Sequence, residues 1–348
     1  MTPSRVLIVR LGALGDVVHA IPVAAALRRA FPRARIDWLV SAKHREILDL
    51  VPVIDRRLVI NDRGGASGGA SLAAAVRELR HARYDVAIDL QGLIKSALLA
   101  RASGAPRVLG FSSRYARERA ARIFYTEAHD PGRGGLYDPR ETRHVVEINL
   151  GLLTLVGITT ARPEFPIDEP PSDAARAMRE RTGGRYALLI PGAAWPNKRW
   201  PPERLAAVAI ELRQRHGLTS VVLWGPDEAP LAAAVAAAAG GAAIVSPPTT
   251  IADLVALARG AALMVSGDTG PTHVAAAIGT PIVGIYGPTR PARNGPLSAL
   301  DITVSRDAVC QCHHLRRCRL DRMCLLDIEV ADVVAAVDRR LAAEHHRV

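Results

Sequence analysis

Residues 262–286 read ALMVSGDTGPTHVAAAIGTPIVGIY and contain the pattern that decides the fold. An apolar strand at 262–265 ends in the polar run Ser266–Thr269. A helix follows at 271–278, and a second apolar strand occupies 281–286. This succession predicts a βαβ unit with parallel strands, because the chain has to cross over the sheet before it can run again in the same direction.

The same alternation of apolar strands and amphipathic helices runs through the rest of the chain. In the first half, the predicted strands are 5–10, 35–40, 56–60, 85–89 and 106–110, and the predicted helices are 16–30, 71–82, 93–102 and 142–156. In the second half, the further predicted strands are 186–190 and 220–224, and the helices are 202–216, 227–239 and 251–259. We therefore predict an α/β fold of two Rossmann-like, doubly wound domains that face a central cleft, with ligands at the carboxyl ends of the strands.

The length of the chain agrees with two domains, since 348 residues exceed the usual size of one hydrophobic core. Four prolines fall between 159 and 173, which is typical of a linker. We expect a first domain at 1–158, this linker, and a second domain at 174–328. The closing segment 329–348 contains a predicted helix at 330–343, which is a candidate for packing back across the first domain.

Positive charge is concentrated in the first half. Residues 1–165 hold 25 Lys and Arg against 16 Asp and Glu, whereas residues 166–348 hold 20 against 18. A basic first domain indicates a polyanionic partner, which could be nucleic acid, anionic lipid or a phosphorylated glycan; a solvated Arg-rich surface is the alternative. Only 4% of the residues are aromatic and no basic-aromatic stripe occurs, so no nucleic-acid partner is expected and lipid or glycan phosphate is preferred.

The N-terminal residues give no sign of a targeting or membrane segment. Their apolar run, Val6–Val9, is too short for the core of a signal peptide and too short to span a bilayer. The Ala-rich stretch Leu231–Val245 has little transfer free energy and indicates a packed helix. We expect a cytoplasmic, soluble protein.

Three segments of the first domain bring polar groups to the predicted cleft. The turn Arg10–Asp16 lacks the G-x-G-x-x-G spacing of dinucleotide-binding folds, which disfavours a dehydrogenase. Its last residue, Asp16, stands at the start of a helix, where a carboxylate is either a cap or a catalytic group. The strand end Asp89–Ser96 could cap the helix after it, and the cationic segment Arg114–Arg119 suits carboxylates, phosphates or a solvated helix face.

Two loops of the second domain are candidates for a phosphate site. The loop 191–201 follows a strand and places Lys198 and Arg199 where a leaving diphosphate could be neutralised. In the stretch quoted first, Asp268 and Thr269 can cap the next helix, whose exposed amides form an anion site. Diphosphate binding follows from this arrangement; the alternative is a well-capped helix with His273 packed inside its first turn.

Four cysteines gather in one segment near the C-terminus: Cys310, Cys312, Cys318 and Cys324. Cytosolic thiols are normally reduced, and four clustered thiols could hold zinc or iron. Their spacing is not that of paired CxxC motifs, and free thiols in a loop are the alternative. We expect no metal in the chemistry, with these four thiols as the candidate ligands if the chain binds one.

Together, the motifs resemble glycosyltransferase family nine over nearly the whole chain. The segments that carry the resemblance are Gly12–Asp16, Asp89–Ser96, Lys198–Pro201, Asp268–His273 and Tyr286–Thr289. Within that family, Asp89–Ser96 and Ala116–Glu118 most resemble the lipopolysaccharide heptosyltransferase I group. The resemblance implies the GT-B arrangement, with an acceptor-binding domain at 1–158 and a nucleotide-sugar-binding domain at 174–328.

The resemblance also implies a reaction. It is the inverting transfer of L-glycero-D-manno-heptose from ADP-heptose to Kdo-lipid A in inner-core synthesis, without a cofactor and in peripheral contact with the inner membrane. Asp16 is then the general base, and Lys198 contacts the donor phosphate. The other implied donor residues are Glu228, for which Asp227 could stand in, and Asp268, Thr269, Gly270 and His273. The acceptor residues assigned are Gly15, Gln91, Lys95 and Arg117.

Three alternatives stand beside this hypothesis. Heptosyltransferase II or a later core transferase would differ only in its acceptor. A nucleotide-sugar epimerase of the same architecture would convert the donor without an acceptor. A non-catalytic sensor of nucleotide sugar would keep its donor binding after loss of Asp16.

Overall fold

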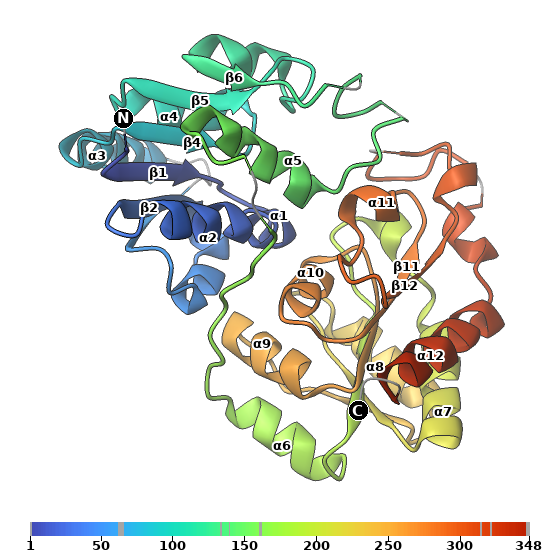
Figure 1. The fold of residues 1–348 in the computed structure, drawn as a ribbon. Coiled ribbons are helices and arrows are strands. Elements are labelled where there is room, and N and C mark those ends of the chain that lie inside the picture. Colours follow the sequence, from blue (N-terminus) through green and yellow to red (C-terminus); the bar gives the residue numbers. More distant parts are fainter. Residues whose placement is uncertain are drawn as a thin grey trace. The chain divides into compact units, whose positions relative to one another are not determined.

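The computed structural model describes residues 2–61, 66–132, 134–138, 140–159, 162–313, 315–320 and 322–345, and only the backbone of 66–72 and 344–345. The chain divides into two compact units, Met1–Asp168 and Glu169–Val348, with the boundary inside the segment 159–173. Each unit is built on one six-stranded sheet with helices around it (Figure 1). The predicted α/β class with two Rossmann-like domains is confirmed.

The sheet of the first unit has the strand order β3-β2-β1-β4-β5-β6, and all of its paired strands are parallel. Its strands are β1 (Arg5–Val9), β2 (Arg35–Ser41), β3 (Arg56–Ile60), β4 (Val86–Asp89), β5 (Arg107–Phe111) and β6 (Glu127–His129). Apart from Arg5 at the start of β1 and Asp89 at the end of β4, the central strands are apolar, because both faces of the sheet are covered. The sequence reading missed β6, a three-residue edge strand without an apolar run.

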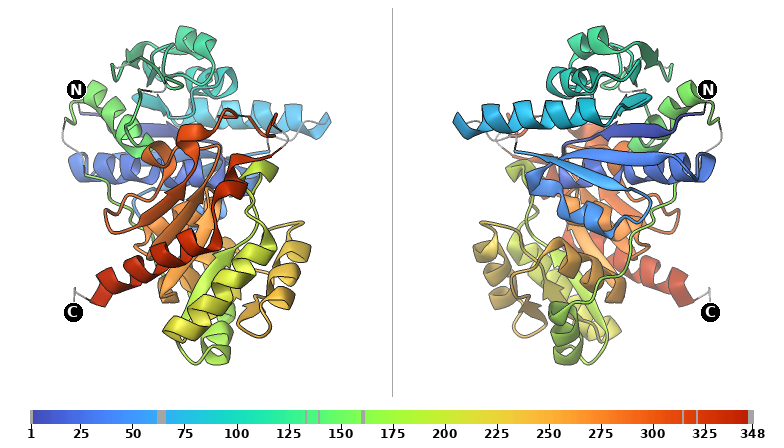
Figure 2. Two further views of the ribbon diagram at one scale, coloured as in Figure 1. Left: turned by 90° about the vertical axis from the view of Figure 1, so that its right-hand side faces the viewer. Right: turned by 90° about the vertical axis from the view of Figure 1, so that its left-hand side faces the viewer.

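Helices cover both faces of this sheet. They are α1 (Leu14–Val18), α2 (Ile21–Ala30), α3 (Ala66–His81), α4 (Ile94–Ala102) and α5 (Val145–Gly151), with short 3-10 helices η1 (Ala42–His44), η2 (Glu46–Leu50), η3 (Arg119–Phe124) and η4 (Leu152–Val156). Figure 2 shows α3, in light blue, and α5, in green, on opposite sides of the sheet. Buried side chains of α3 and α4, such as Leu79 and Leu99, pack with Leu7 and Val9 of β1 in one hydrophobic cluster.

The helix predicted at 16–30 is two helices in the structure. The chain ends α1 at Val18 and begins α2 at Ile21. Pro22 explains the interruption, because it has no N–H to donate to the carbonyl four residues before it. In the first turn of a new helix that N–H is not needed, so the break falls just before the proline.

The second unit repeats the topology of the first. Its sheet has the order β12-β11-β10-β7-β8-β9, again with parallel pairs only. The strands are β7 (Tyr186–Ile190), β8 (Thr219–Val222), β9 (Ala243–Val245), β10 (Leu263–Gly267), β11 (Ile282–Tyr286) and β12 (Ile302–Ser305). Two peripheral strands, β9 and β12, were not predicted, because both are short and only partly buried.

The helices of this unit are α6 (Asp173–Arg181), α7 (Pro202–His216), α8 (Ala229–Ala238), α9 (Ile251–Gly260), α10 (Gly270–Ala277), α11 (Pro291–Asn294) and α12 (Val330–His345). The 3-10 helices are η5 (Pro196–Lys198), η6 (Asp307–Val309) and η7 (Cys324–Asp327). In Figure 1, α9 and α10 lie on one face of the sheet, and α7 and α12 lie on the other.

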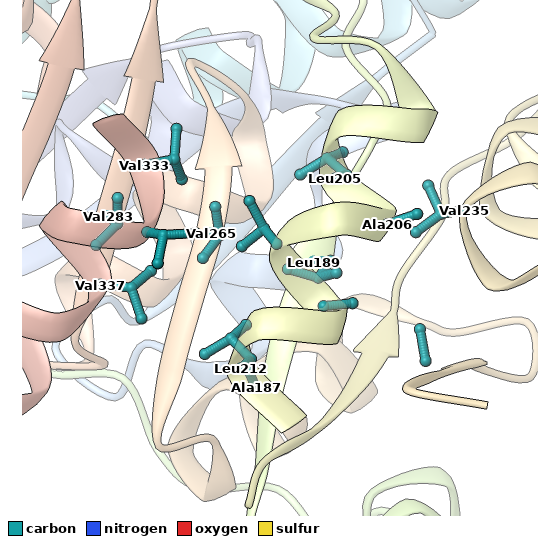
Figure 3. Close-up of a cluster of buried hydrophobic side chains, with 14 of the residues drawn as sticks. Ala187, Leu189, Leu205, Ala206, Leu212, Val235, Val265, Val283, Val333 and Val337 are labelled. Carbon is teal, nitrogen blue, oxygen red and sulfur yellow. The ribbon is translucent and has the colours of Figure 1, made fainter. Parts of the chain in front are cut away.

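The closing helix α12 belongs to the second unit, which corrects the suggestion that it packs across the first domain. It packs against α7, β11 and β12. Val333 and Val337 are buried beside Val283 of the sheet (Figure 3). The side chain of Arg340 reaches the buried Asp301, with 2.8 Å between its Nε and the carboxylate oxygen Oδ1. The apolar side of α12 is thus buried against the second sheet. The sequence pattern shows that the helix has an apolar side, but not which sheet that side packs against.

We expect Val337→Ala to destabilise the second unit by about 2 kcal/mol, because the substitution removes two buried carbon atoms and leaves a cavity. Hydrogen exchange measured by mass spectrometry should rise in peptides from β10 and β11. Arg339→Ala, on the exposed side of α12, is the matched control and should change little. Faster exchange confined to peptides from β1 and β2 would contradict this packing.

Candidate functional site

Asp16 lies in the first turn of α1, directly after the loop that leaves β1, and two arginines hold its carboxylate. Nη2 of Arg10 is 2.7 Å from Oδ1 of Asp16, and Nη1 of Arg117 is 3.5 Å from Oδ2. The same Oδ2 accepts a hydrogen bond from the backbone N–H of Ala13 at 3.3 Å. Asp16 is the third residue of α1 and lies inside its first turn. Its carboxylate therefore both bonds to the backbone at the helix start and forms the ion pairs.

The arginines determine the charge of this carboxyl group. Burial by itself raises the pKa of Asp16, but the charges of Arg10 and Arg117, with a smaller contribution from His19, lower it further than burial raises it. The pKa therefore lies well below its ordinary value of 3.8, and the group stays ionised at neutral pH.

Sequence reasoning missed Arg10, the more tightly bound of the two arginines. Arg10 is almost fully buried, at 5% exposure, and its Nη1 also donates to the carbonyl of Leu90 after β4. Arg117 is 42% exposed at its side chain and makes the longer contact. A charged residue directly after the apolar run Val6–Val9 was the available signal, since a buried cation needs a buried partner.

The loop after β4 is organised by Asp89, which is completely buried. Its carboxylate accepts hydrogen bonds from the hydroxyl of Tyr125 at 2.7 Å, the hydroxyl of Ser96 at 2.9 Å and the backbone N–H of Gln91 at 2.9 Å. Burial raises the pKa of Asp89, and these hydrogen bonds oppose that effect. Asp89 thus fixes the loop before α4 and reaches the helix only through the hydroxyl of Ser96. The predicted capping role of Asp89 and Gln91 is wrong, because Leu93 is the N-cap residue and its side chain makes no capping hydrogen bond.

The predicted acceptor residues lie in different surroundings. Gln91 is buried, and its Oε1 accepts from the backbone N–H of Leu11 at 2.7 Å, so it supports the loop that carries Asp16. Gly15 is buried within α1. Lys95 is exposed on α4 and forms no ion pair with any residue that the structure describes.

A close approach at Gly92 positions Arg117. The φ angle of Gly92 is +69°, and a Cβ placed there would lie 3.0 Å from the backbone nitrogen of Arg117. The carbonyl of Gly92 accepts from the N–H of Glu118 at 2.9 Å, and the carboxylate of Glu118 accepts from the N–H of Ile94 at 2.6 Å. The segment with Arg117 is therefore anchored on the β4–α4 loop.

In the second unit, Asp268 at the end of β10 is the centre of the candidate site. Its Oδ2 lies 2.5 Å from Nζ of Lys198, and its Oδ1 lies 3.0 Å from Nε2 of His273. Burial alone raises the pKa of Asp268, but His273 and Lys198 lower it by more, to well below its ordinary value. Nζ of Lys198 also sits 4.4 Å from the centre of the Trp195 ring, a cation–π distance.

The start of α10 differs from the predicted pattern of caps. Thr269 occupies the N-cap position, yet its side chain makes no capping hydrogen bond. Its hydroxyl lies 3.0 Å from that of Thr272, which in turn donates to the carbonyl of Gly267 at 2.6 Å. The carboxylate of Asp268 likewise makes its contacts with the side chains of Lys198 and His273.

Glu228 rather than Asp227 turns towards the other loops of this sheet edge. The carboxylate of Glu228 accepts from the N–H of Gly225 at 3.0 Å. A Cβ placed on Gly192, in the loop after β7, would overlap Oε2 of Glu228, so a larger residue there would displace this carboxylate. Asp227 is exposed and has a positive φ of 66°.

The four cysteines are free thiols of the second unit. The sulfur atoms of Cys312 and Cys318 lie 3.2 Å apart, and burial raises the pKa of Cys324 to about 12. Within the described ranges, no three Cys, His, Asp or Glu side chains are arranged to hold a metal ion.

None of the helices in the described part of the chain combines the length and the apolar character that crossing a bilayer requires.

Two Rossmann-like units, each with ionised side chains at the carboxyl edge of its sheet, have the architecture of the GT-B class of glycosyltransferases. The model of glycosyltransferase family 9 (heptosyltransferase) matches residues 72–323, and the chain belongs to this family.

Named relatives agree with this assignment. Lipopolysaccharide heptosyltransferase 1 of Pseudomonas aeruginosa is 30% identical over 317 residues, which cover 88% of this chain and 85% of that protein. Lipopolysaccharide heptosyltransferase 3 of Escherichia coli is 27% identical, with 94% and 96% covered. Among solved structures, E. coli heptosyltransferase WaaC with ADP-2-deoxy-2-fluoro heptose has a TM-score of 0.74 at 25% identity, with 98% and 99% covered. The predicted family is thus confirmed, while the relatives include more than one type of heptosyltransferase.

The depressed pKa of Asp268 predicts an acid-sensitive second unit. Because the folded-state pKa is below the ordinary value of 3.8, the ionised carboxylate stabilises the fold above that pH, and this contribution is lost as the pH falls. We expect the free energy of unfolding of the wild type to drop more steeply between about pH 5 and pH 3 than that of Asp268→Asn.

Urea unfolding at a series of pH values would measure this difference. Tryptophan fluorescence reports mainly on the second unit, which holds three of the four tryptophans. The control Asp173→Asn removes a carboxylate that is 92% exposed and should keep the wild-type slope. Parallel curves for wild type and Asp268→Asn would show that the Lys198 and His273 contacts add no stability.

Proposed function

We propose that this protein transfers L-glycero-D-manno-heptose from ADP-heptose to Kdo-lipid A, with inversion at the anomeric carbon and without a metal or other cofactor. The observation that carries the proposal is the carboxylate of Asp16, kept ionised by Arg10 and Arg117 at the sheet edge of a heptosyltransferase-family chain. The reaction is assigned to the cytoplasmic face of the inner membrane, where a lipid-linked acceptor is accessible.

The proposed chemical step uses both units. The Asp16 carboxylate accepts the proton of the acceptor hydroxyl while that oxygen bonds to the anomeric carbon of heptose. The bond from that carbon to the β-phosphate oxygen breaks, and the electron pair leaves with ADP. Lys198 stabilises the negative charge that develops on the diphosphate.

Donor binding is assigned to the edge of the second sheet. The similar E. coli heptosyltransferase WaaC was solved with ADP-2-deoxy-2-fluoro heptose, which supports ADP-heptose as the donor here. Lys198 is paired with Asp268, so a diphosphate would draw its ammonium group away or share it. Since the side chain of Thr269 leaves the first amides of α10 uncapped, Thr269 and Gly270 can place a phosphate oxygen against those amides. His273 holds Asp268 in place, and Glu228 is assigned to the ribose.

Acceptor binding is assigned to the first unit, which carries the excess of positive charge. Arg117 and Lys95 are exposed cations suited to the carboxylates and phosphates of Kdo-lipid A. Gly15 and Gln91 shape the loop that carries Asp16. If an acceptor anion draws Arg117 away from Asp16, the pKa of that carboxyl rises and it becomes a stronger base once the acceptor is bound.

Heptosyltransferase II or a later core transferase is the alternative within the family, and an epimerase or a sensor of nucleotide sugar is the alternative outside the proposed reaction. The test is incubation of the protein with ADP-heptose and a panel of Kdo-terminated and heptose-terminated acceptors, followed by mass spectrometry. Product on the Kdo-terminated acceptor alone supports the proposal. Product only on heptose-terminated acceptors identifies a later transferase, and conversion of donor without acceptor identifies an epimerase.

Asp16→Asn should lower kcat on the order of a hundredfold or more while leaving the Kd for ADP-heptose close to that of the wild type, because the amide cannot accept the proton. Steady-state kinetics and calorimetric titration of the donor would measure the two quantities. Asp49→Asn removes an exposed carboxylate of the same unit, paired with Arg57, and serves as the control. The contrary outcome is an unchanged kcat together with a lower melting temperature of the variant, by the same amount with and without donor. Asp16 would then only stabilise its helix.

Arg117→Ala should raise the KM for the acceptor several-fold and leave the KM for ADP-heptose unchanged, because the lost cation belongs to the acceptor side. High salt should reduce the difference, since it screens exposed charges over a Debye length of about 8 Å or less. Arg114→Ala is a matched control in the same segment, because Arg114 is paired with Asp130. Weaker donor binding with unchanged acceptor kinetics would overturn the assignment of the acceptor to the first unit.

A further inference from the structure

The outer face of α4 is unusual for a helix that covers a sheet. Ala97, Leu99 and Ala100 are buried in the core of the first unit. On the opposite side, Ile94 and Leu98 are exposed at 38% and 47%. They share that face with the exposed cations Lys95 and Arg101, since positions three, four and seven residues apart lie close together on a helix surface.

The neighbouring helix η3 has the same combination of side chains. Ile123 is 75% exposed, the highest value among the exposed large apolar side chains of the described residues. Arg119, four residues before it, is exposed as well. The two helices pack against each other, and the carboxylate of Glu118 accepts from the N–H of Ile94 at 2.6 Å, so their starts are tied together. We name the exposed residues of both helices the α4–η3 face: Ile94, Lys95, Leu98, Arg101, Arg119 and Ile123.

The charge around this face has one sign. Residues 93–124 contain seven Lys and Arg and a single acidic residue, Glu118, whose carboxylate is already bonded to the backbone. Among the described residues, Lys95, Arg101 and Arg119 have no acidic partner. Aliphatic side chains surrounded by cations match the surface of an anionic bilayer, where the apolar groups enter the acyl boundary and the cations meet the phosphates.

We propose that the α4–η3 face docks the first unit on an anionic lipid bilayer. The inference rests on the proposed function in one respect, namely that the acceptor is lipid-linked and lies in such a bilayer. The face is continuous with the acceptor side, because Arg117 precedes Arg119 by two residues and contacts Asp16. Docking would therefore bring the head group of an embedded acceptor to the carboxylate.

The experiment is co-sedimentation of the full-length protein with vesicles. Vesicles of phosphatidylcholine and phosphatidylglycerol at seven to three are compared with pure phosphatidylcholine, at low and at high salt. We expect the wild type to bind the anionic vesicles and to be released from them by salt. Leu98→Ser/Ile123→Ser and Arg101→Gln/Arg119→Gln should each lower the partition coefficient by at least about tenfold.

Matched controls come from exposed residues elsewhere. Leu297→Ser/Val309→Ser removes aliphatic side chains of the second unit that are 39% and 62% exposed, and it should bind vesicles as the wild type does. Circular dichroism and thermal melts establish that each variant is folded. The proposal would be falsified if the wild type did not bind anionic vesicles, or if variants of the α4–η3 face bound them as strongly as the wild type does.

Kinetic measurements separate this proposal from the proposed reaction. The α4–η3 variants should transfer heptose to a soluble, delipidated Kdo acceptor at the wild-type rate and lose rate only with acceptor embedded in vesicles. If the vesicle results hold but no acceptor is glycosylated, the reaction is wrong and the docking face stands. If the variants change self-association in analytical ultracentrifugation and leave vesicle binding intact, the face binds a second copy of the chain and the lipid proposal is overturned.

Discussion

Parallel strands all end at one edge of their sheet, and in both units of this chain that edge holds a carboxylate largely withdrawn from water. Such a carboxylate is costly unless a cation or several hydrogen bonds stabilise its charge. Asp16 is held by Arg10 and Arg117, and Asp268 is held by Lys198. The Asp16–Arg117 and Asp268–Lys198 pairs each join segments that follow different strands, so the requirement for charge balance also fixes the shape of the candidate site.

The cations around each carboxylate are not equivalent. Arg10 is buried and close to Asp16, whereas Arg117 is partly exposed and more distant, so the first can maintain the loop while the second is free to meet another anion. The proposed reaction, which joins an anionic, lipid-linked acceptor to a nucleotide sugar, would benefit from such a division. The cations of residues 93–124 extend this positive surface beyond the carboxylate, next to aliphatic side chains that water solvates poorly.

Much of the fold could be predicted from the sequence because local patterns dictate it. The strand at 186–190 and the helix at 202–216 have the bounds that the hydrophobic periodicity predicted. The motif at Asp268 was singled out because polar residues between a buried strand and a helix rarely serve packing alone. The family was likewise evident from short motifs. In contrast, the hydrophobic pattern did not predict edge strands such as β6, because three half-buried residues are too few to show a period.

The sequence by itself thus determined the two-domain α/β class, the family and the loops at which the candidate site lies, since each is specified by residues near one another along the chain. The tertiary structure decided which partners those residues take. It paired Asp16 with Arg10, turned Gln91 to the backbone of Leu11, and placed α12 on the second sheet. These outcomes depend on contacts between distant segments, and periodicity and spacing contain no information about which of several apolar faces or buried charges will meet.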